Sequence, residues 1–111
     1  MDINKIKSFK HKDSTIKKIS INYKKCRLLE DNNIVCESEE DNYLVKEDLY
    51  KMIKSKVDFI LMHMERELSM IIYNEYFSRK VDNWWIYYFS RSTYYRLKNK
   101  AMDNFLEWWY A

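Results

Sequence analysis

The sequence predicts an all-α fold, a small helical domain with a long central helix and a C-terminal helix-turn-helix. The chain of 111 residues contains neither glycine nor proline, whereas tight β-hairpin turns prefer glycine or asparagine at positive φ and long β proteins rarely lack both glycine and proline. Apolar residues recur at spacings of three and four along much of its length, as they do on one face of an α-helix. With 47% hydrophobic and 17% aromatic residues, the chain can form one modest core.

Charge is arranged in blocks, although the net charge is only +3. Residues 1–29 hold nine Lys or Arg and two Asp, residues 30–48 hold eight acids and one Lys, and residues 79–111 hold six bases and three acids. These blocks suggest a basic arm, an acidic connector and a basic C-terminal surface. For the first two blocks, a solvated surface that neutralises itself is an equally good interpretation.

The first part of the chain, residues 1–44, is interpreted as a basic N-terminal helix followed by an acidic linker. The first dozen residues carry few apolar side chains and are expected to be flexible. A helix is expected from Ser14, capped by Asp13 or Ser14 itself. Its apolar stripe comprises Ile16, Ile19, Tyr23 and Cys26. A strand is the alternative, because residues 19, 21 and 23 also alternate, and the acidic linker has room for an extended piece at 34–36.

The second part, residues 45–111, begins with the clearest element, a helix over 45–77. Its apolar residues recur at threes and fours, with three more widening the stripe on one side. A helix of this length exceeds the width of a small domain, so it either bends or reaches out to meet another chain. The stripe comprises Leu49, Ile53, Val57, Ile60, Met64, Leu68 and Ile71, widened by Met52, Phe59 and Met70.

The C-terminal residues predict two further helices joined by a short turn. A dense apolar helix is expected over 82–89, capped by Asp82 or Asn83, and Ser90 caps a longer helix that runs to about Trp108. A short helix, a tight turn and a second helix make a helix-turn-helix. On a helical wheel the inward face of the second helix comprises Tyr94, Leu97, Ala101, Phe105 and Trp108, and the outward face comprises Ser92, Arg96, Asn99 and Asp103.

The stretch "SRSTYYRLKNKAMDNFL", which begins at Ser90, resembles the C-terminal helix of phage-type transcriptional regulators of the ArpU kind. Those proteins are similar to the region-4 helix-turn-helix of sigma factors. The likeness extends over about residues 71–110 and is specific over 90–106, whereas "NWWIYYF" is shorter and more aromatic than the first helix of that family. The glycine-free composition also resembles that of small mollicute proteins. The resemblance implies a DNA-binding regulator.

The outward residue types favour the same function. Arg can contact guanine through two hydrogen bonds, Asn can do so with adenine, and hydroxyl groups and free amides at a helix start can bind phosphates. We therefore expect the protein to be a small DNA-binding transcription regulator in the cytoplasm. The candidate contacts with double-stranded DNA are Arg79, Lys80, Arg91, Ser92, Thr93, Tyr95, Arg96, Lys98, Asn99 and Lys100.

A non-enzymatic interaction module is the alternative function, either bound to RNA polymerase or forming a homodimer or hetero-complex. The long helix and the "FLEWWY" terminus offer more apolar surface than a chain of this size easily buries, and Trp and Tyr are common at binding hot spots. A third hypothesis is a single-strand or RNA binder that stacks bases on its tyrosines. No set of catalytic residues is recognisable, so an enzyme is the least favoured class.

No cofactor or metal site is expected either. Cys26 and Cys36 are separated by nine residues, which matches no zinc motif, and His63 and Glu67 are interpreted as surface residues rather than as a ligand pair. No run of 18 apolar residues or signal peptide is present, so a membrane partner is not expected and the thiols are expected to be reduced.

Overall fold

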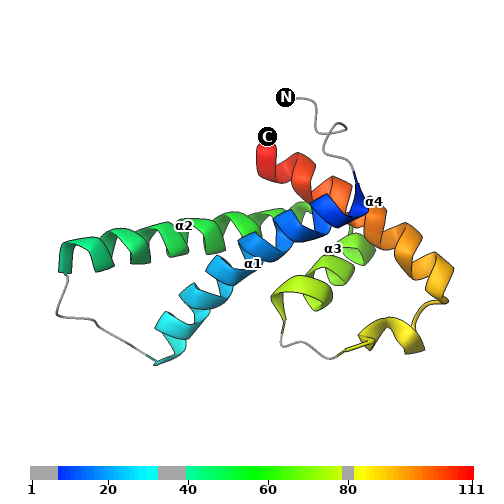
Figure 1. Cartoon of the computed structure of the whole chain (residues 1–111), viewed down its shortest axis with the longest axis horizontal. Coiled ribbons are helices and arrows are strands. Elements are labelled where there is room, and N and C mark those ends of the chain that lie inside the picture. Colours follow the sequence, from blue (N-terminus) through cyan, green and yellow to red (C-terminus); the bar gives the residue numbers. More distant parts are fainter. Residues whose placement is uncertain (1–7, 33–39, 79–81) are drawn as a thin grey trace.

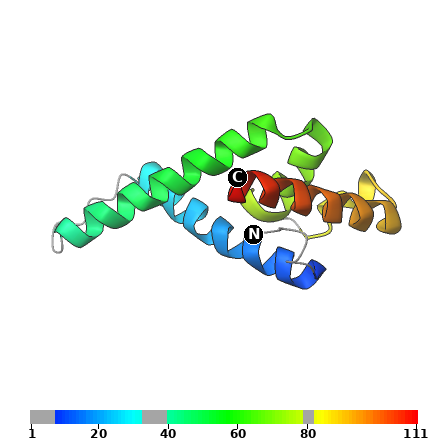
Figure 2. The same ribbon diagram turned by 90° about the horizontal axis from the view of Figure 1, so that it is seen from above.

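The protein is predominantly helical in residues 8–32, 40–78 and 82–111, the parts that this computed structural model describes. The α-helices are α1 (Phe9–Asn32), α2 (Glu40–His63), α3 (Arg66–Ile72) and α4 (Arg91–Tyr110). Between α3 and α4 lie a π-helical turn, η2 (Tyr73–Phe77), and a 3-10 turn, η3 (Trp84–Tyr87). No strand occurs in those three ranges, which confirms the predicted all-α class. Helices α1 and α2 form a V, and α4 lies between its open arms (Figures 1 and 2).

Helix α1 begins five residues earlier than predicted. The Oγ atom of Ser8 accepts a hydrogen bond from the backbone amide of His11 at 3.1 Å, so Ser8 occupies the capping position assigned to Asp13 or Ser14. Asp13 is instead engaged in contacts with other helices. The helix continues through residues 19–23, so the strand alternative is wrong there. The predicted flexible tail, residues 1–7, and the extended piece at 34–36 lie outside the described residues. The stripe of α1 is buried as predicted, at Ile16, Ile19, Tyr23 and Cys26.

The predicted 45–77 helix is two helices and a π-helical turn. Helix α2 ends at His63, and Glu65 adopts an extended conformation with φ −53° and ψ 135° before α3 begins. The Oγ atom of Ser69 donates a hydrogen bond to the carbonyl of Leu61 at 2.7 Å, so one carbonyl freed by the break has a partner. The break lets α3 fold back against α4, so the long stripe bends at this point (Figure 1).

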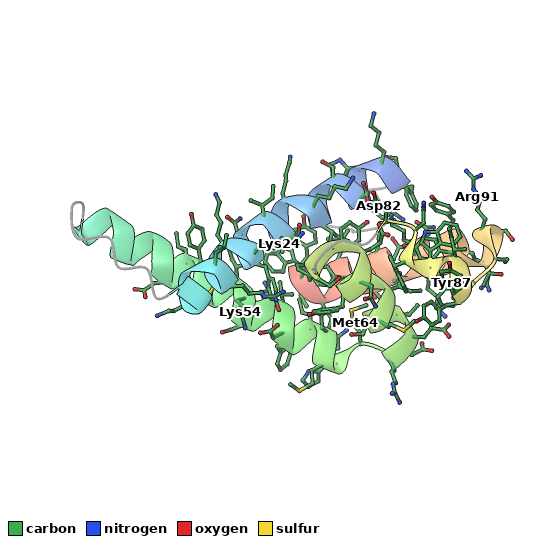
Figure 3. The ribbon with its side chains drawn as sticks, turned by 90° about the horizontal axis from the view of Figure 1, so that it is seen from below. Lys24, Lys54, Met64, Asp82, Tyr87 and Arg91 are labelled. Carbon is green, nitrogen blue, oxygen red and sulfur yellow. The ribbon has the colours of Figure 1, made fainter. Side chains whose placement is uncertain are left out.

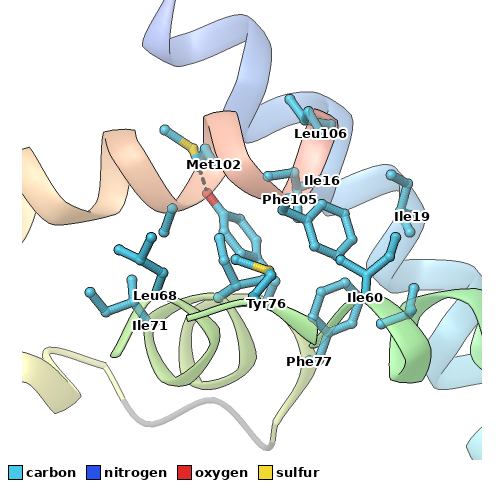
Figure 4. Close-up of a cluster of buried hydrophobic side chains, with 14 of the residues drawn as sticks. Ile16, Ile19, Ile60, Leu68, Ile71, Tyr76, Phe77, Met102, Phe105 and Leu106 are labelled. Atoms are coloured by element: carbon cyan, nitrogen blue, oxygen red, sulfur yellow. Dashed lines mark hydrogen bonds between the residues drawn. The ribbon is translucent and has the colours of Figure 1, made fainter. Parts of the chain in front are cut away.

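One hydrophobic core unites all four helices (Figure 4). Because α1 contributes to the same cluster as α2, α3 and α4, the proposed division at residue 44 does not separate two cores. The buried part of the long stripe starts only at Val57. Leu49 is 50% exposed and Met52 is exposed too, because the first half of α2 extends past the core (Figure 1), whereas Phe59 is exposed because it lies on the side of α2 away from Val57 and Ile60. The largest fully buried side chains include Ile16, Ile60, Ile71, Phe77, Tyr94 and Phe105.

The segment expected as a short α-helix over 82–89 contains only the single 3-10 turn η3. Its run of aromatic and β-branched residues has low helix propensity, and Asn83, with φ 57°, is in the left-handed region and makes no side-chain capping bond. Trp84 and Trp85 pack their rings on Tyr94, at 5.7 and 4.6 Å between centroids. The packing of these two rings, rather than helix formation, holds the segment against α4.

Helix α4 begins where the sequence predicts. The Oγ atom of Ser90 accepts a hydrogen bond from the amide of Thr93 at 3.3 Å, which confirms Ser90 as its cap. Its predicted inward face is buried at Tyr94, Ala101 and Phe105, whereas Trp108 is 36% exposed. Trp108 lies at the end of α4, where its ring contacts the rings of Phe59 and His63 on α2.

Candidate nucleic-acid interface

The predicted DNA contacts fall into three groups in the structure. Arg79 and Lys80 lie outside the described residues. Lys98 and Asn99 are bonded to residues of other elements. The remaining residues surround the first three turns of α4. Of these, Thr93 is half-buried, and the exposed ones are Arg91, Ser92, Tyr95, Arg96 and Lys100.

The start of α4 offers free backbone donors beside two arginines. Ser90 caps the amide of Thr93, and the amide of Tyr94 donates to the Ser90 carbonyl at 2.9 Å. The amides of Arg91 and Ser92 precede these bonds and have no hydrogen-bond partner among the described residues. Free amides and the positive end of the helix dipole make a helix start attractive to phosphate.

A shallow depression runs from this helix start to the first turn of α1. Figure 3 shows Arg91 at one end of the molecule, with its guanidinium group pointing away from the ribbon. The rings of Phe9 and Tyr95 lie 6.1 Å apart on the floor. The depression is lined by Phe9, Lys12, Arg91, Tyr95, Arg96 and Asn99.

The cations of the depression differ in how they are paired. Lys12 is almost fully buried and forms an ion pair with Asp103 at 2.8 Å. Neither Arg91 nor Arg96 has a carboxylate within ion-pair distance among the described residues. Both guanidinium groups are therefore free to bind an incoming anion.

Asn99 is not free to recognise adenine as predicted. Its Oδ1 atom accepts a hydrogen bond of 2.6 Å from Nζ of Lys12, because the first turn of α1 crosses α4 at this point. The predicted outward face thus includes Ser92 and Arg96, whereas Asn99, although exposed, and the half-exposed Asp103 are both bonded to Lys12. The helical wheel could not show this, because the wheel describes one helix and α1 was assigned to a separate part of the chain.

Lys98 was expected to contact phosphate, but it is a buried structural residue, 6% exposed. Its Nζ atom lies 3.2 Å from Glu75 and 3.5 Å from Asp13. The same ammonium group lies over the rings of Phe9 and Tyr76. Since two carboxylates and two rings surround it, Lys98 belongs to the interior of the molecule and not to the DNA-binding surface.

The carboxylates around Lys98 form a polar network that sequence analysis missed. Asp13 accepts a hydrogen bond of 2.5 Å from the hydroxyl of Tyr76 and pairs with Lys17 at 2.8 Å. Burial raises the pKa of the Asp13 carboxyl, but the hydrogen bonds from Lys17 and Tyr76 and the charge of Lys98 together lower it below its ordinary value. The network fixes α4 against α1 and η2.

Two buried tyrosines, Tyr76 and Tyr94, lie beside this network. Burial and a hydrogen bond to Asp13 raise the pKa of Tyr76 far above its ordinary value, so it remains a neutral donor. Burial also raises the pKa of Tyr94, whose buried hydroxyl has no hydrogen bond of good geometry to any described residue. The indole of Trp84 donates to Glu75 at 3.2 Å, which links η3 to the same network.

Beside the helix start, η3 presents apolar side chains that sequence analysis had assigned to a packed helix. Tyr87 is 93% exposed, and Ile86 and Tyr88 are more than half exposed. Figure 3 shows Tyr87 at the same end of the molecule as Arg91. Aromatic rings beside unpaired arginines can stack on bases or pack against a protein. Helical periodicity gave no signal for this exposure.

His63 and Glu67 are exposed, as predicted. The His63 ring stacks on Phe59 at 4.0 Å between centroids, and its Nδ1 atom lies 2.8 Å from the Phe59 carbonyl. In the described ranges, no group of three or more His, Cys, Asp or Glu side chains is placed to hold a metal ion. Cys26 is buried, and Cys36 lies outside those ranges.

None of the helices in the described ranges has the length and apolar character needed to cross a membrane. Comparisons of this chain with protein-family models, with curated proteins and with solved structures found no match.

Proposed function

We propose that this protein binds DNA through the first three turns of α4 and acts as a small transcription regulator. The observation that carries the proposal is the pair of exposed, unpaired guanidinium groups of Arg91 and Arg96 beside the free amides of a capped helix start. A recognition helix contacts base edges with its N-terminal residues, and Arg is the side chain most suited to guanine. The likeness of residues 90–106 to ArpU-type regulators supports the same function and implies a cytoplasmic location.

Within this proposal the residues have separate roles. Arg96 and Ser92 face base edges, while Arg91, Lys100 and the first amides of α4 bind phosphates. Thr93 and Tyr95 add hydroxyl groups at the sides of the helix. Asn99 keeps one donor group for a base, because its carbonyl oxygen is occupied by Lys12.

The direct test is binding of the purified chain to labelled random-sequence duplex and single-stranded DNA, measured by fluorescence anisotropy over a salt series. A preference for duplex with affinity that falls steeply as salt rises is expected. The double variant Arg91→Ala/Arg96→Ala should lose most of this binding, whereas Lys24→Ala, an exposed charge change on α1, should not. An absence of duplex binding at low salt would contradict the proposal, and a preference for the single strand would favour base stacking instead.

A protein-docking role is the second candidate function, and the exposure of Tyr87, Tyr88 and Ile86 favours it. Large exposed side chains that adjoin a charged surface are typical of interaction sites. RNA polymerase, which transcription regulators contact, is the partner to test. A Tyr87→Ser variant that keeps full DNA affinity but loses co-purification with RNA polymerase would support this second role.

A further inference from the structure

Helix α2 is apolar on two faces, and only one of them is covered. Val57 and Ile60 point into the core and are almost fully buried. On another side of the same helix, Met52 is 68% exposed, Phe59 is 51% exposed and Met62 is 77% exposed. An exposed apolar stripe on a helix is typical of a surface that binds a partner.

The spacing of this exposed stripe is that of a coiled coil. Asp48, Met52, Ser55, Phe59 and Met62 follow one another at four, three, four and three residues. At 100° per residue they lie within a strip about 80° wide. Alternating steps of three and four along one strip place side chains at the a and d positions of a heptad repeat. These five residues are called the α2 seam below.

We infer that the α2 seam binds the α2 seam of a second copy of this chain, with the two helices antiparallel. In one register, Met52 lies opposite Met62 of the partner subunit, and Ser55 lies opposite Phe59 of the partner subunit. The two-fold axis repeats both contacts, which gives four layers. A large side chain opposite a small one lets two helices approach closely, so Phe59 fills the space that Ser55 leaves.

The charges at the ends of the seam are complementary in this same register. Asp48 lies at one end, and Arg66, the first residue of α3, follows the other end. Both are exposed, and neither has an ion-pair partner among the described residues. Antiparallel pairing brings the Asp48 end of the seam to the turn between α2 and α3 of the partner subunit, the turn that Arg66 of the partner subunit follows, so charges of opposite sign lie at that end and the symmetry repeats the arrangement.

Near the two-fold axis, two like-charged pairs would meet, but each charge already has an interaction in its own chain. Asp58 pairs with Lys54 at 2.8 Å and accepts a hydrogen bond from Tyr23 at 2.9 Å. Lys56 lies over the ring of Trp109 at 4.5 Å, which draws its ammonium group toward α4. The charges at the two ends of the seam, and not those near the two-fold axis, therefore favour the antiparallel arrangement of the two helices.

This inference is independent of the proposed DNA binding, because the seam lies on α2 and the DNA site on α4. A lipid surface suits the seam less well. The acids Asp48, Asp58 and Glu65 are interspersed around the stripe with the bases Lys51, Lys56 and Arg66, so the helix lacks the predominantly basic face of membrane-binding helices.

The first test measures the oligomeric state of the purified chain by sedimentation equilibrium from low to high micromolar concentration. A reversible dimer is expected. Met62→Asp should raise its dissociation constant at least about tenfold, because it places an acid in an apolar layer beside Met52 of the partner subunit. Ile21→Asp is the matched control, since Ile21 is a 53% exposed apolar residue on α1 and lies away from the seam. A wild-type chain that stays monomeric, or a dimer unaffected by Met62→Asp, overturns the inference.

The second test fixes the direction of the helices. The variants Met52→Cys and Met62→Cys are each made in a background with Cys36→Ser. Each variant is oxidised mildly by itself, and the two are also mixed and oxidised together. In the antiparallel register residue 52 lies opposite residue 62 of the partner subunit, and equal positions are offset by about 15 Å along the axis. A disulfide is therefore expected in the mixture alone. Cross-linking of Met52→Cys with itself would overturn the antiparallel arrangement even if the chain is a dimer.

Discussion

The Nζ atom of Lys12 lies 2.6 Å from Oδ1 of Asn99 and 2.8 Å from a carboxylate oxygen of Asp103. This contact ties the first turn of α1 to the middle of α4. Because an ammonium group only donates, Asn99 must use its carbonyl oxygen for Lys12 and keep its NH2 group for other partners. Recognition of adenine through two hydrogen bonds needs both groups, so Asn99 can offer a base only a donor. The contact with Lys12 therefore limits the hydrogen bonds that α4 can make to DNA bases through Asn99.

The Lys12 contact should contribute measurably to stability. Lys12→Met keeps the aliphatic length but removes the charge, so Asp103 loses its ion pair and Asn99 loses a charged donor. We expect the free energy of unfolding to fall by about 1–2 kcal/mol, since Asp103 is half exposed and solvent screens its charge. Urea denaturation measures this. Lys10→Met, an exposed change on the same helix, is the control, and an equal loss in both variants would contradict the assigned role.

Lys98 should matter for stability and not for DNA affinity. Lys98→Met leaves Glu75 and Asp13 facing each other without the ammonium group between them. Removing one partner of a buried ion pair typically costs about 3–5 kcal/mol, and partial exposure of both carboxylates places this variant near the lower value. Thermal melting should therefore show a large loss, while the salt dependence of DNA binding stays unchanged. A stable Lys98→Met variant whose DNA binding depends less steeply on salt would contradict this prediction and would show that Lys98 contacts phosphate.

What could be predicted from the sequence was the behaviour of each helix by itself. The Ser90 cap, the buried stripe of α1 and the inward side of α4 at Tyr94 and Phe105 depend on local spacing and local hydrogen bonds. The break at Glu65 contains no Gly or Pro, so no local signal marked it. It forms because folding α3 back against α4 buries Leu68 and Ile71, which a straight helix would leave exposed.

The errors in the predicted site have the same physical origin. A helical wheel places Asn99 in solvent, where it does lie, but cannot show its bond to Lys12 on α1, and it places Lys98 at the side of α4 without the contacts from α1 and η2 that bury it. Only side chains remote in sequence, such as Lys12 and Asp13, supply those contacts. Arg91 and Arg96 are exposed as the wheel predicts for Arg96, because α1 contacts these turns at Tyr95 and Asn99 and pairs with neither guanidinium group.

Stability should depend on pH through Asp13. The pKa of its carboxyl is lowered in the folded protein, so folding favours the ionised form. This contribution is complete above the ordinary pKa of aspartate and is lost as the pH falls through the lowered folded value. Asp13→Asn should therefore be less stable than the wild type near neutral pH, with the difference shrinking at about pH 3. Urea denaturation at both pH values checks this, and a difference that is independent of pH would argue against the assignment.

A charged side chain placed in the core should unfold the whole domain. Ile60 is 1% exposed and packs in the cluster that all four helices share. Ile60→Asp buries a carboxylate without a partner and removes an apolar side chain worth about 1.5–3 kcal/mol, which together should unfold a domain of ordinary stability. Circular dichroism and thermal melting measure the outcome. Leu49→Asp, at a half-exposed position of the same helix, should retain a cooperative transition near that of the wild type.

Arg96 and Lys100 should affect DNA binding in different ways. Arg96 lies on the outward side of α4, so Arg96→Ala should cost about 1–3 kcal/mol against a preferred duplex and relax sequence preference. Lys100 lies further along the helix and can neutralise phosphate only, so Lys100→Ala should weaken all duplexes alike and lower the salt slope by about one unit. Anisotropy titrations with a selected duplex and a scrambled one separate the two effects. If both variants weaken the two duplexes equally, Arg96 contacts phosphate and base recognition is wrong, and if neither variant weakens them, α4 is not the DNA-binding surface.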